Sequence, residues 1–217
     1  MARSAVSRSA VSRPAVSRRE QNKLEKRARI IAAARALFPH KGFDATTTQE
    51  IAHAAEVAVG TLFVYAKTKE DLLIQVFHEE MVGIVERAFQ AALHRRTLID
   101  QLTTFFQTLV DYHEQDRPLA LALMRQLSYV QSEEQRAAVA DLMRGLLRRL
   151  AVLIDSAKTR GEVAEGVGLK DSAEAVFALY FHRLGMLLNG YVGRERFDRD
   201  LPRQLSVLMA GIKRSSA

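Results

Sequence analysis

The sequence predicts an all-α protein of about nine helices. Glycine and proline, which interrupt helices, account for only 11 and 4 of the 217 residues, whereas Ala and Leu are abundant. Apolar residues recur at intervals of three and four along most of the chain, which is the spacing of one helix face. Capping pairs and isolated glycines divide this pattern into segments of helical length.

Composition excludes several kinds of site. The chain has no cysteine, which excludes disulfides, thiolate metal ligands and cysteine nucleophiles. Its six histidines form no spaced metal motif, and neither a Gly-rich phosphate loop nor a serine nucleophile elbow is present. We therefore expect no enzymatic activity, no cofactor and no metal site. Because no apolar run resembles a membrane span or a secretory signal, we expect a cytoplasmic location and no membrane partner.

The net charge of +7 lies entirely at the N-terminus, where residues 1–29 hold nine basic and two acidic residues. Such an asymmetry indicates a polyanionic partner. Residues 3–17 repeat a five-residue unit that begins with Arg and ends with Ala-Val-Ser, a period that fits neither helix nor strand. We expect residues 1–19 to form a flexible basic arm that contacts DNA phosphates or a minor groove. An inert extension or a misassigned translation start is an equal alternative.

A first helix is predicted from about Glu20 to His40, with Leu24, Ala28 and Phe38 on its apolar side. Pro39 is expected to kink or end it, and Gly42 supplies a stop signal.

Residues 47–65 predict two short helices joined by a tight turn. Thr47 and Glu50 form a capping box at the start of the first, whose apolar face is Ile51, Ala52 and Ala55. Leu62 marks the inner side of the second, so the other residues of 59–65 lie largely outward. This arrangement is typical of a helix-turn-helix, whose second helix fits a DNA major groove.

The same residues resemble the DNA-binding domain of the tetracycline-repressor (TetR) family of bacterial regulators. The motifs that carry the resemblance are Arg29 to Ala34, Leu37-Phe38, Gly42-Phe43, Ala45 to Thr47, Ile51-Ala52, Gly60 to Phe63, Tyr65 and Lys69 to Leu73. The resemblance implies a DNA-binding domain at residues 20–67 and an effector-binding and dimerisation domain at 68–217. It further implies a homodimeric repressor that binds an inverted-repeat operator and is released by a small hydrophobic or amphipathic effector.

From the resemblance and the exposed face of the second helix we expect the following residues to contact DNA: Thr47, Thr48, Ala58, Val59, Gly60, Thr61, Phe63, Val64, Tyr65 and Lys69. Residues 59–65 contain no Arg, Lys, Asn or Gln, the usual bidentate readers of purines. Specificity is therefore expected to rest on methyl contacts, DNA shape and dimer spacing. Thr47 also has a purely structural interpretation as a helix cap, and Lys69 one as a solvated charge.

Four residues depart from the family pattern. Ala58 replaces a capping Ser, Glu56 a common Gly in the turn, and Phe63 a common Tyr. Ala66 replaces a Phe, so that either a void exists beside it or a neighbour fills the space.

Thr68 and Asp71 are expected to cap a fourth helix, whose apolar positions span about six turns. These positions are Leu72, Leu73, Val76, Phe77, Met81, Ile84, Val85 and Phe89. Further helices are expected over about 98–114, 118–130, 132–160, 171–193 and 202–212, with Pro118 and Pro202 as first-turn residues, Ser132 and Gln135 as a capping box, and Gly161 as a stop.

Candidate effector contacts are the aromatic and apolar residues Phe105, Phe106, Leu109, Tyr112, Met124, Leu127, Tyr129, Phe177 and Tyr180. Polar contacts could come from His113, Arg125, Gln126, His182 and Arg183. In the family the last two helices pair between subunits, which points to Phe177, Tyr180, Phe181, Leu184 and Leu188 as the dimer seam. Ordinary core packing is the alternative for each apolar candidate.

A basic architectural protein that binds DNA without an effector is the alternative function. It would account for the arm, but it would leave the helical C-terminal part without a role.

Overall fold

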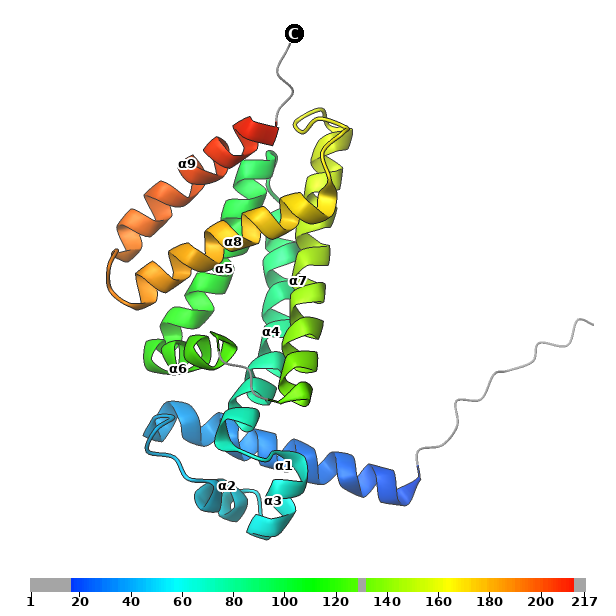
Figure 1. Cartoon of the computed structure of the whole chain (residues 1–217), viewed down its shortest axis with the longest axis vertical. Coiled ribbons are helices and arrows are strands. Elements are labelled where there is room, and N and C mark those ends of the chain that lie inside the picture. Colours follow the sequence, from blue (N-terminus) through cyan, green and yellow to red (C-terminus); the bar gives the residue numbers. More distant parts are fainter. Residues whose placement is uncertain (1–16, 129–131, 213–217) are drawn as a thin grey trace, which may run out of the picture.

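The computed structural model describes residues 17–128 and 132–212 of the chain. Within these residues the fold consists of α-helices and contains no strand, as predicted (Figure 1). The helices are α1 (Arg18–Lys41), α2 (Thr48–Ala54), α3 (Val59–Tyr65), α4 (Lys69–Leu93), α5 (Leu98–Gln115), α6 (Arg117–Ser128), α7 (Glu133–Thr159), α8 (Leu169–Leu188) and α9 (Arg194–Ile212). The repeated part of the expected arm, residues 1–16, and Tyr129 lie outside the described residues.

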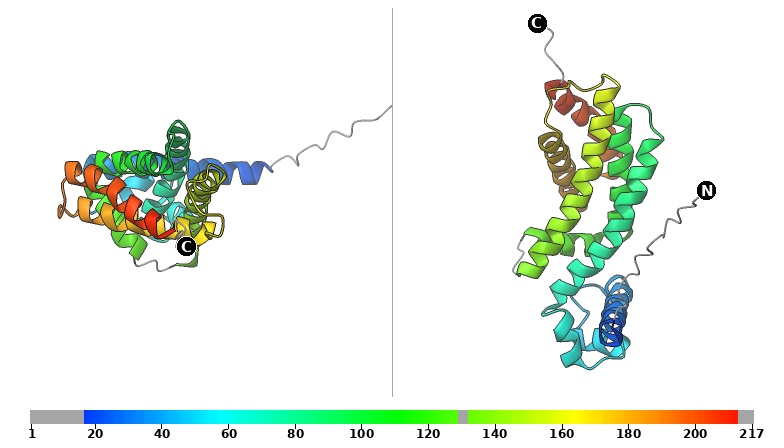
Figure 2. Two further views of the ribbon diagram at one scale, coloured as in Figure 1. Left: turned by 90° about the horizontal axis from the view of Figure 1, so that it is seen from above. Right: turned by 90° about the vertical axis from the view of Figure 1, so that its right-hand side faces the viewer.

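The molecule is elongated, with α1, α2 and α3 grouped at one end (Figure 1). Helix α4 runs from this group into a bundle of α5, α7, α8 and α9 at the other end. Figure 2 shows α4 and α7 side by side along much of their length, and they are among the most extensively packed pairs. Helix α4 therefore belongs to both ends of the molecule. None of the described helices has the length and hydropathy of a membrane span.

Three predicted capping boxes are present, at Thr47–Glu50, Thr68–Asp71 and Ser132–Gln135. In each, the hydroxyl accepts the backbone N–H three residues on, and the side chain at that position accepts the N–H of the cap. These interactions satisfy amides that the first helical turn leaves free, and they set where α2, α4 and α7 begin.

Helix α1 begins earlier than predicted and buries a shorter face. Ser17 caps it, so Arg18 and Arg19 belong to the helix and not to the expected arm. Leu24 is 57% exposed and Ala28 is also exposed, because the N-terminal half of α1 projects past α4 (Figure 1). Burial starts at Ile30.

The last two helices also differ from their predicted bounds. Helix α8 ends at Leu188 instead of about 193, because Gly190 turns the chain with a φ of 79°. Helix α9 begins at Arg194, and Pro202 lies inside it. The predicted start at Pro202 is wrong, because a proline favours the first turn of a helix but can also lie inside one.

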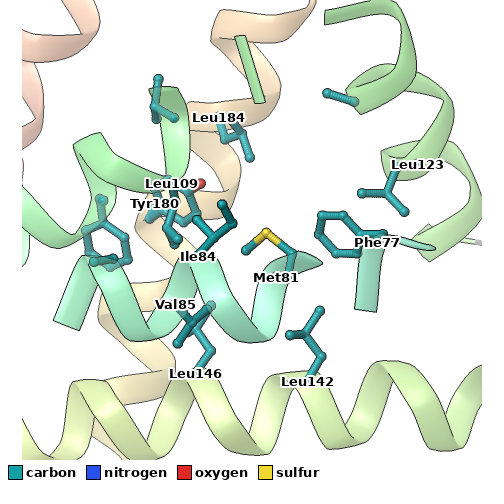
Figure 3. Close-up of a cluster of buried hydrophobic side chains, with 14 of the residues drawn as sticks. Phe77, Met81, Ile84, Val85, Leu109, Leu123, Leu142, Leu146, Tyr180 and Leu184 are labelled. Atoms are coloured by element: carbon teal, nitrogen blue, oxygen red, sulfur yellow. The ribbon is translucent and has the colours of Figure 1, made fainter. Parts of the chain in front are cut away.

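The core of the upper bundle is continuous across five helices. Figure 3 shows side chains of α4, α5, α6, α7 and α8 meeting in one apolar cluster. All eight apolar positions predicted along α4 are buried, which confirms its helical register. The rings of Phe106 and Tyr180 stack at 4.5 Å with an angle of 8°, and this contact joins α5 to α8.

The turn between α2 and α3 contains a strained residue. Glu56 adopts a φ of 53°, a left-handed conformation that costs a residue with a Cβ roughly 1–2 kcal/mol. Its exposed ion pair with Arg29, at 3.6 Å, contributes little to stability. We expect Glu56→Gly to raise the free energy of unfolding by about 0.5–1 kcal/mol, after the larger chain entropy of unfolded glycine is subtracted. Urea unfolding measures this, and an unchanged or lower value would contradict it.

Candidate DNA-binding surface and effector cavity

Helix α3 presents an apolar outer face. Leu62 is fully buried, which fixes the rotation of the helix, while Val64 is 73% and Phe63 45% exposed. Val59 is also exposed, and Thr61 and Tyr65 are half-buried. The amide of Gln75 on α4 donates to the Tyr65 carbonyl at 3.0 Å and so holds the end of α3. The residues of α3 that were predicted to face outward, opposite Leu62, therefore lie on one accessible surface.

The start of α3 is weakly held, as the sequence indicated. Ala58 is its N-cap and makes no side-chain cap bond. Gly60 follows in the first turn, and a Cβ built there would have no heavy atom within 4 Å. Packing within the chain therefore does not require glycine at this position.

Thr47 and Thr48 lie at the start of α2. Thr47 is exposed, and its hydroxyl accepts the backbone N–H of Glu50 as the helix cap. Thr48 is half-buried in the first turn. Glu50 accepts hydrogen bonds from Lys41 and from Thr47, and these interactions, that of Lys41 foremost, lower the pKa of Glu50 to about 2. The structural role of Thr47 is thus present without DNA.

Lys69 has a structural role that the sequence did not reveal. Its ammonium donates to the carbonyls of Phe43 at 2.7 Å and Asp44 at 3.2 Å, and lies 4.5 Å from the centroid of the Phe43 ring. The side chain therefore ties the start of α4 to the loop between α1 and α2. Neither of its sequence interpretations, phosphate contact or solvated charge, included this tie.

We expect Lys69→Met to lower the free energy of unfolding by about 1–2 kcal/mol, because two carbonyls lose a charged donor. Lys26→Met, at an exposed lysine of α1, is the control for loss of charge alone. Equal stability of the two variants in urea unfolding would show that the tie contributes nothing.

A void exists beside Ala66, one of the two alternatives raised by its departure from the family pattern. A cavity of about 330 Å³ borders Ala66 and separates α3 and the start of α4 from the start of α7. Gln135 of α7 crosses this gap by donating from its side-chain amide to Asp71, and Lys67 pairs with Glu134 at 3.5 Å. The first turn of α7 thus contacts the cap of α4.

A larger cavity, of about 500 Å³, lies between α1, α4, α5 and α6. Its apolar wall includes Phe77, Ile84 and Leu123, which also belong to the core cluster of Figure 3. The complete lining is Arg35, Pro39, Leu73, Val76, Phe77, Glu80, Ile84, Arg87, Tyr112, His113, Gln115, Asp116, Leu119, Ala120 and Leu123. An apolar wall with a few polar groups is typical of a small-molecule site.

A polar chain crosses the cavity lining. Arg35 of α1 pairs with Glu80 of α4 at 2.9 Å, and the Tyr112 hydroxyl of α5 donates to the other oxygen of Glu80. Burial, followed by the bond to Glu80, raises the pKa of Tyr112 and keeps the phenol a donor. The cavity is therefore lined by polar groups of three helices, one of them in the N-terminal group.

His113 is the buried titratable group of the lining. Its ring stacks on Phe77 at 5.8 Å and meets Tyr112 edge-on at 5.3 Å. Burial lowers the pKa of His113 to about 4, so the imidazole is neutral at neutral pH.

Most predicted effector residues lie away from this cavity. Tyr112 lines it, as does His113 from the polar set. Phe105, Phe106, Leu109 and Tyr180 are buried in the packed core, while Met124, Leu127 and Phe177 are half-buried outside the lining. The remaining polar candidates are exposed (Arg125, His182), half-buried (Gln126) or buried 3.7 Å from Asp200 (Arg183). Sequence reasoning missed the α6 wall, although Leu119, Ala120 and Leu123 have helical spacing.

The predicted dimer seam is only partly on the surface. Leu184 and Leu188 are buried within the subunit, at 2% and 1% exposure, so they line its own core. Tyr180 is buried as well, whereas Phe177 and Phe181 are half-buried with their rings 5.8 Å apart. Val207 of α9 is 74% exposed. The exposed surface of α8 and α9 is therefore formed by residues other than Leu184 and Leu188.

Comparison with known proteins identifies the N-terminal helices. Residues 30–76 match the family model of bacterial regulatory proteins of the tetR family. The fatty acid metabolism regulator protein of Bacillus subtilis is 29% identical over 162 residues, which cover 72% of this chain and 80% of the relative. The HTH-type transcriptional repressor KstR of Rhodococcus jostii is 27% identical over 142 residues, covering 64% of this chain and 65% of that protein.

Solved structures extend the similarity to both ends of the molecule. The crystal structure of the Bacillus subtilis transcriptional regulator FadR in complex with stearoyl-CoA covers 86% of this chain and 99% of its own, with a TM-score of 0.64 and 26% identity. The Thermus thermophilus FadR structure covers 88% and 97%, with a TM-score of 0.71 and 24% identity. The N-terminal helices are therefore those of the TetR family of bacterial regulatory proteins, and the chain as a whole has the fold of the solved FadR regulators.

Proposed function

We propose that the protein is a repressor that binds an inverted-repeat operator as a homodimer and is released by an amphipathic effector. In this proposal α1, α2 and α3 form the DNA-binding domain, residues 68–217 the effector-binding and dimerisation domain, and the residues before Ser17 a basic arm. One observation carries it: the 500 Å³ cavity is lined both by α1 and by α4, α5 and α6. A molecule in this cavity contacts the DNA-binding domain directly.

Regulation requires that the effector favours one conformation. A ligand with equal affinity for both states shifts nothing, so the effector must bind the conformation with low DNA affinity more tightly. The cavity combines an apolar wall with Arg35, Glu80 and Arg87, which suits a molecule with an apolar tail and a polar head. The stearoyl-CoA bound by the related FadR has this character and supports the choice of class.

Operator reading in this proposal uses the apolar face of α3. Thr61 supplies one hydroxyl, and Val59 and Val64 supply methyl groups for thymine. We expect replacement of both Thr61 and Val64 by Ala to reduce discrimination between operator and random duplex about thirtyfold, since each of the two lost contacts contributes roughly 1 kcal/mol. Unchanged discrimination in competition binding would refute methyl readout.

A seven-residue recognition helix covers little DNA, so two copies related by a two-fold axis are expected. We place the contact between subunits on the exposed faces of α8 and α9, with Phe177 and Phe181 at its edge. Sedimentation analysis tests this, and a strict monomer at micromolar concentration would exclude the dimer.

Selection of bound genomic fragments, followed by fluorescence anisotropy on the selected duplex, tests the whole proposal. The expected result is an inverted repeat bound far more tightly than random DNA and released by stearoyl-CoA. The architectural alternative predicts equal binding of selected and random duplexes. Release by no acyl thioester of any chain length would contradict the effector class while leaving DNA recognition intact.

A further inference from the structure

The charges around the large cavity are unevenly satisfied. Glu80 is held by Arg35 and Tyr112, and the Asp116 carboxylate accepts the Leu119 backbone N–H at 3.0 Å at the start of α6. His113 is neutral at neutral pH because it is buried. Arg87 is exposed and forms no ion pair with any residue that the structure describes. The formal charges of the lining, from Arg35, Arg87, Glu80 and Asp116, therefore sum to zero, and Arg87 is the arginine that keeps its charge available for a bound anion.

Arg35 of α1 and Arg87 of α4 line the same cavity as Glu80. A Cβ added at Gly83 would lie 3.7 Å from a terminal nitrogen of Arg87. The guanidinium of Arg87 therefore lies beside Gly83, on the side of the α4 N-terminus, where Glu80 is located. The Arg35 side chain is 45% exposed and the Glu80 side chain 28%. An ion in solution can therefore reach both arginines without opening the core.

We propose that Arg35 and Arg87 form an anion-binding subsite of the effector cavity, and that the anionic head of the effector replaces Glu80 as the partner of Arg35. This inference rests on the proposed function and names the head group as phosphate or carboxylate. An arginine fork pairs with either anion in the same geometry that it uses for a glutamate. The apolar tail then occupies the wall formed by Phe77, Ile84 and Leu123.

Replacement of Glu80 by the effector's anionic head affects the DNA-binding domain, because Arg35 belongs to α1. One turn away on the same helix, Ile31 and Phe38 are buried in the core of that domain. Arg27 and Arg35 also pair with Glu79, at 2.9 and 3.5 Å, so two arginines of α1 and two glutamates of α4 hold the helices together. Losing the Arg35–Glu80 pair removes one of these contacts and loosens α1 on α4.

The test compares two probes that share a tail. Stearoyl-CoA carries phosphates, whereas the stearoyl thioester of N-acetylcysteamine is neutral, and calorimetry on the full chain gives the Kd of each. We expect Arg87→Gln to weaken stearoyl-CoA about tenfold, the effect of one charged hydrogen bond, with the neutral thioester unchanged. Glu80→Gln should tighten stearoyl-CoA several-fold, because the internal competitor loses its charge. Arg148→Gln, at an exposed arginine of α7 outside this lining, should change neither.

The role of Arg35 is tested by measuring how strongly effector binding and operator binding affect each other. The ratio of the stearoyl-CoA Kd on operator-bound protein to that on free protein gives the coupling between the two sites. For Arg35→Gln we expect this ratio to fall toward one, with thermal unfolding near that of wild type. A purely structural role of Arg35 would lower stability and leave the ratio unchanged.

Two failures are distinguishable. If wild-type protein binds neither probe, the proposed effector class is wrong and the subsite falls with it. If wild type binds both probes, and the Arg87 and Glu80 variants behave like Arg148→Gln, the effector class stands and the anion subsite is wrong.

Discussion

Replacement of His113 by Phe is expected to make the protein more stable than wild type at pH 5. The pKa of His113 is lowered to about 4 by burial, whereas an unfolded histidine titrates near 6.5. Between these values the unfolded chain binds a proton that the folded chain excludes, so stability falls as the pH falls from 6.5 toward 4. Between pH 8 and pH 5 the loss is on the order of 2 kcal/mol.

Urea unfolding at several pH values measures this loss. Phe has a ring of similar size for the stack on Phe77, so His113→Phe should remove the dependence without opening a void. His182→Gln, at an exposed histidine, is the matched control and should leave the dependence intact. Glu50 does not confuse the result, because its lowered pKa moves its contribution to the window between about 4.5 and 2. An identical loss in wild type and His113→Phe would contradict the assignment.

Gly60→Ala is expected to separate folding from DNA binding. Alanine favours a helix over glycine by up to about 1 kcal/mol, and its Cβ would meet no atom of the chain. Stability should therefore stay equal or rise. If the backbone of Gly60 approaches a phosphate, the added methyl stands between them, and we expect operator affinity to fall at least about tenfold through loss of this contact.

Gly145→Ala provides a matched control, since Gly145 is an exposed glycine within α7 whose added Cβ also meets nothing. It should gain similar helix stability and retain full operator affinity in fluorescence anisotropy. If Gly60→Ala binds the operator as tightly as Gly145→Ala does, the backbone of Gly60 does not approach a phosphate closely.

Local signals predicted the local structure. The pairs Thr47–Glu50, Thr68–Asp71 and Ser132–Gln135 indicated three helix starts because a capping box involves only residues three apart. Leu62 indicated the rotation of α3, and its complete burial confirms that rotation, whereas the equally apolar Phe63 and Val64 lie outward. In each case the determining contacts lie close in the sequence.

Contacts between distant helices escaped the same reasoning. Helical spacing marked Leu184 and Leu188 as apolar, but it does not say whether such a face meets a helix of its own subunit or of another. The large cavity depends on how α1 and α6 approach α4, which no periodicity encodes. The tie of Lys69 to two loop carbonyls likewise depends on tertiary approach of residues 25 and 26 positions apart. These features need the three-dimensional structure.

In the proposed dimer, the gap beside Ala66 bears on how the two DNA-binding domains fit an operator. One carboxylate oxygen of Asp71 accepts the backbone N–H groups of Lys67 and Thr68, and the other accepts the side-chain amide of Gln135. These bonds hold the first turn of α4 against α7. We expect the free space beside α3 to let α3 change its angle to α4 without breaking these hydrogen bonds. Two such domains in the proposed dimer would then accept small differences in the distance between half-sites.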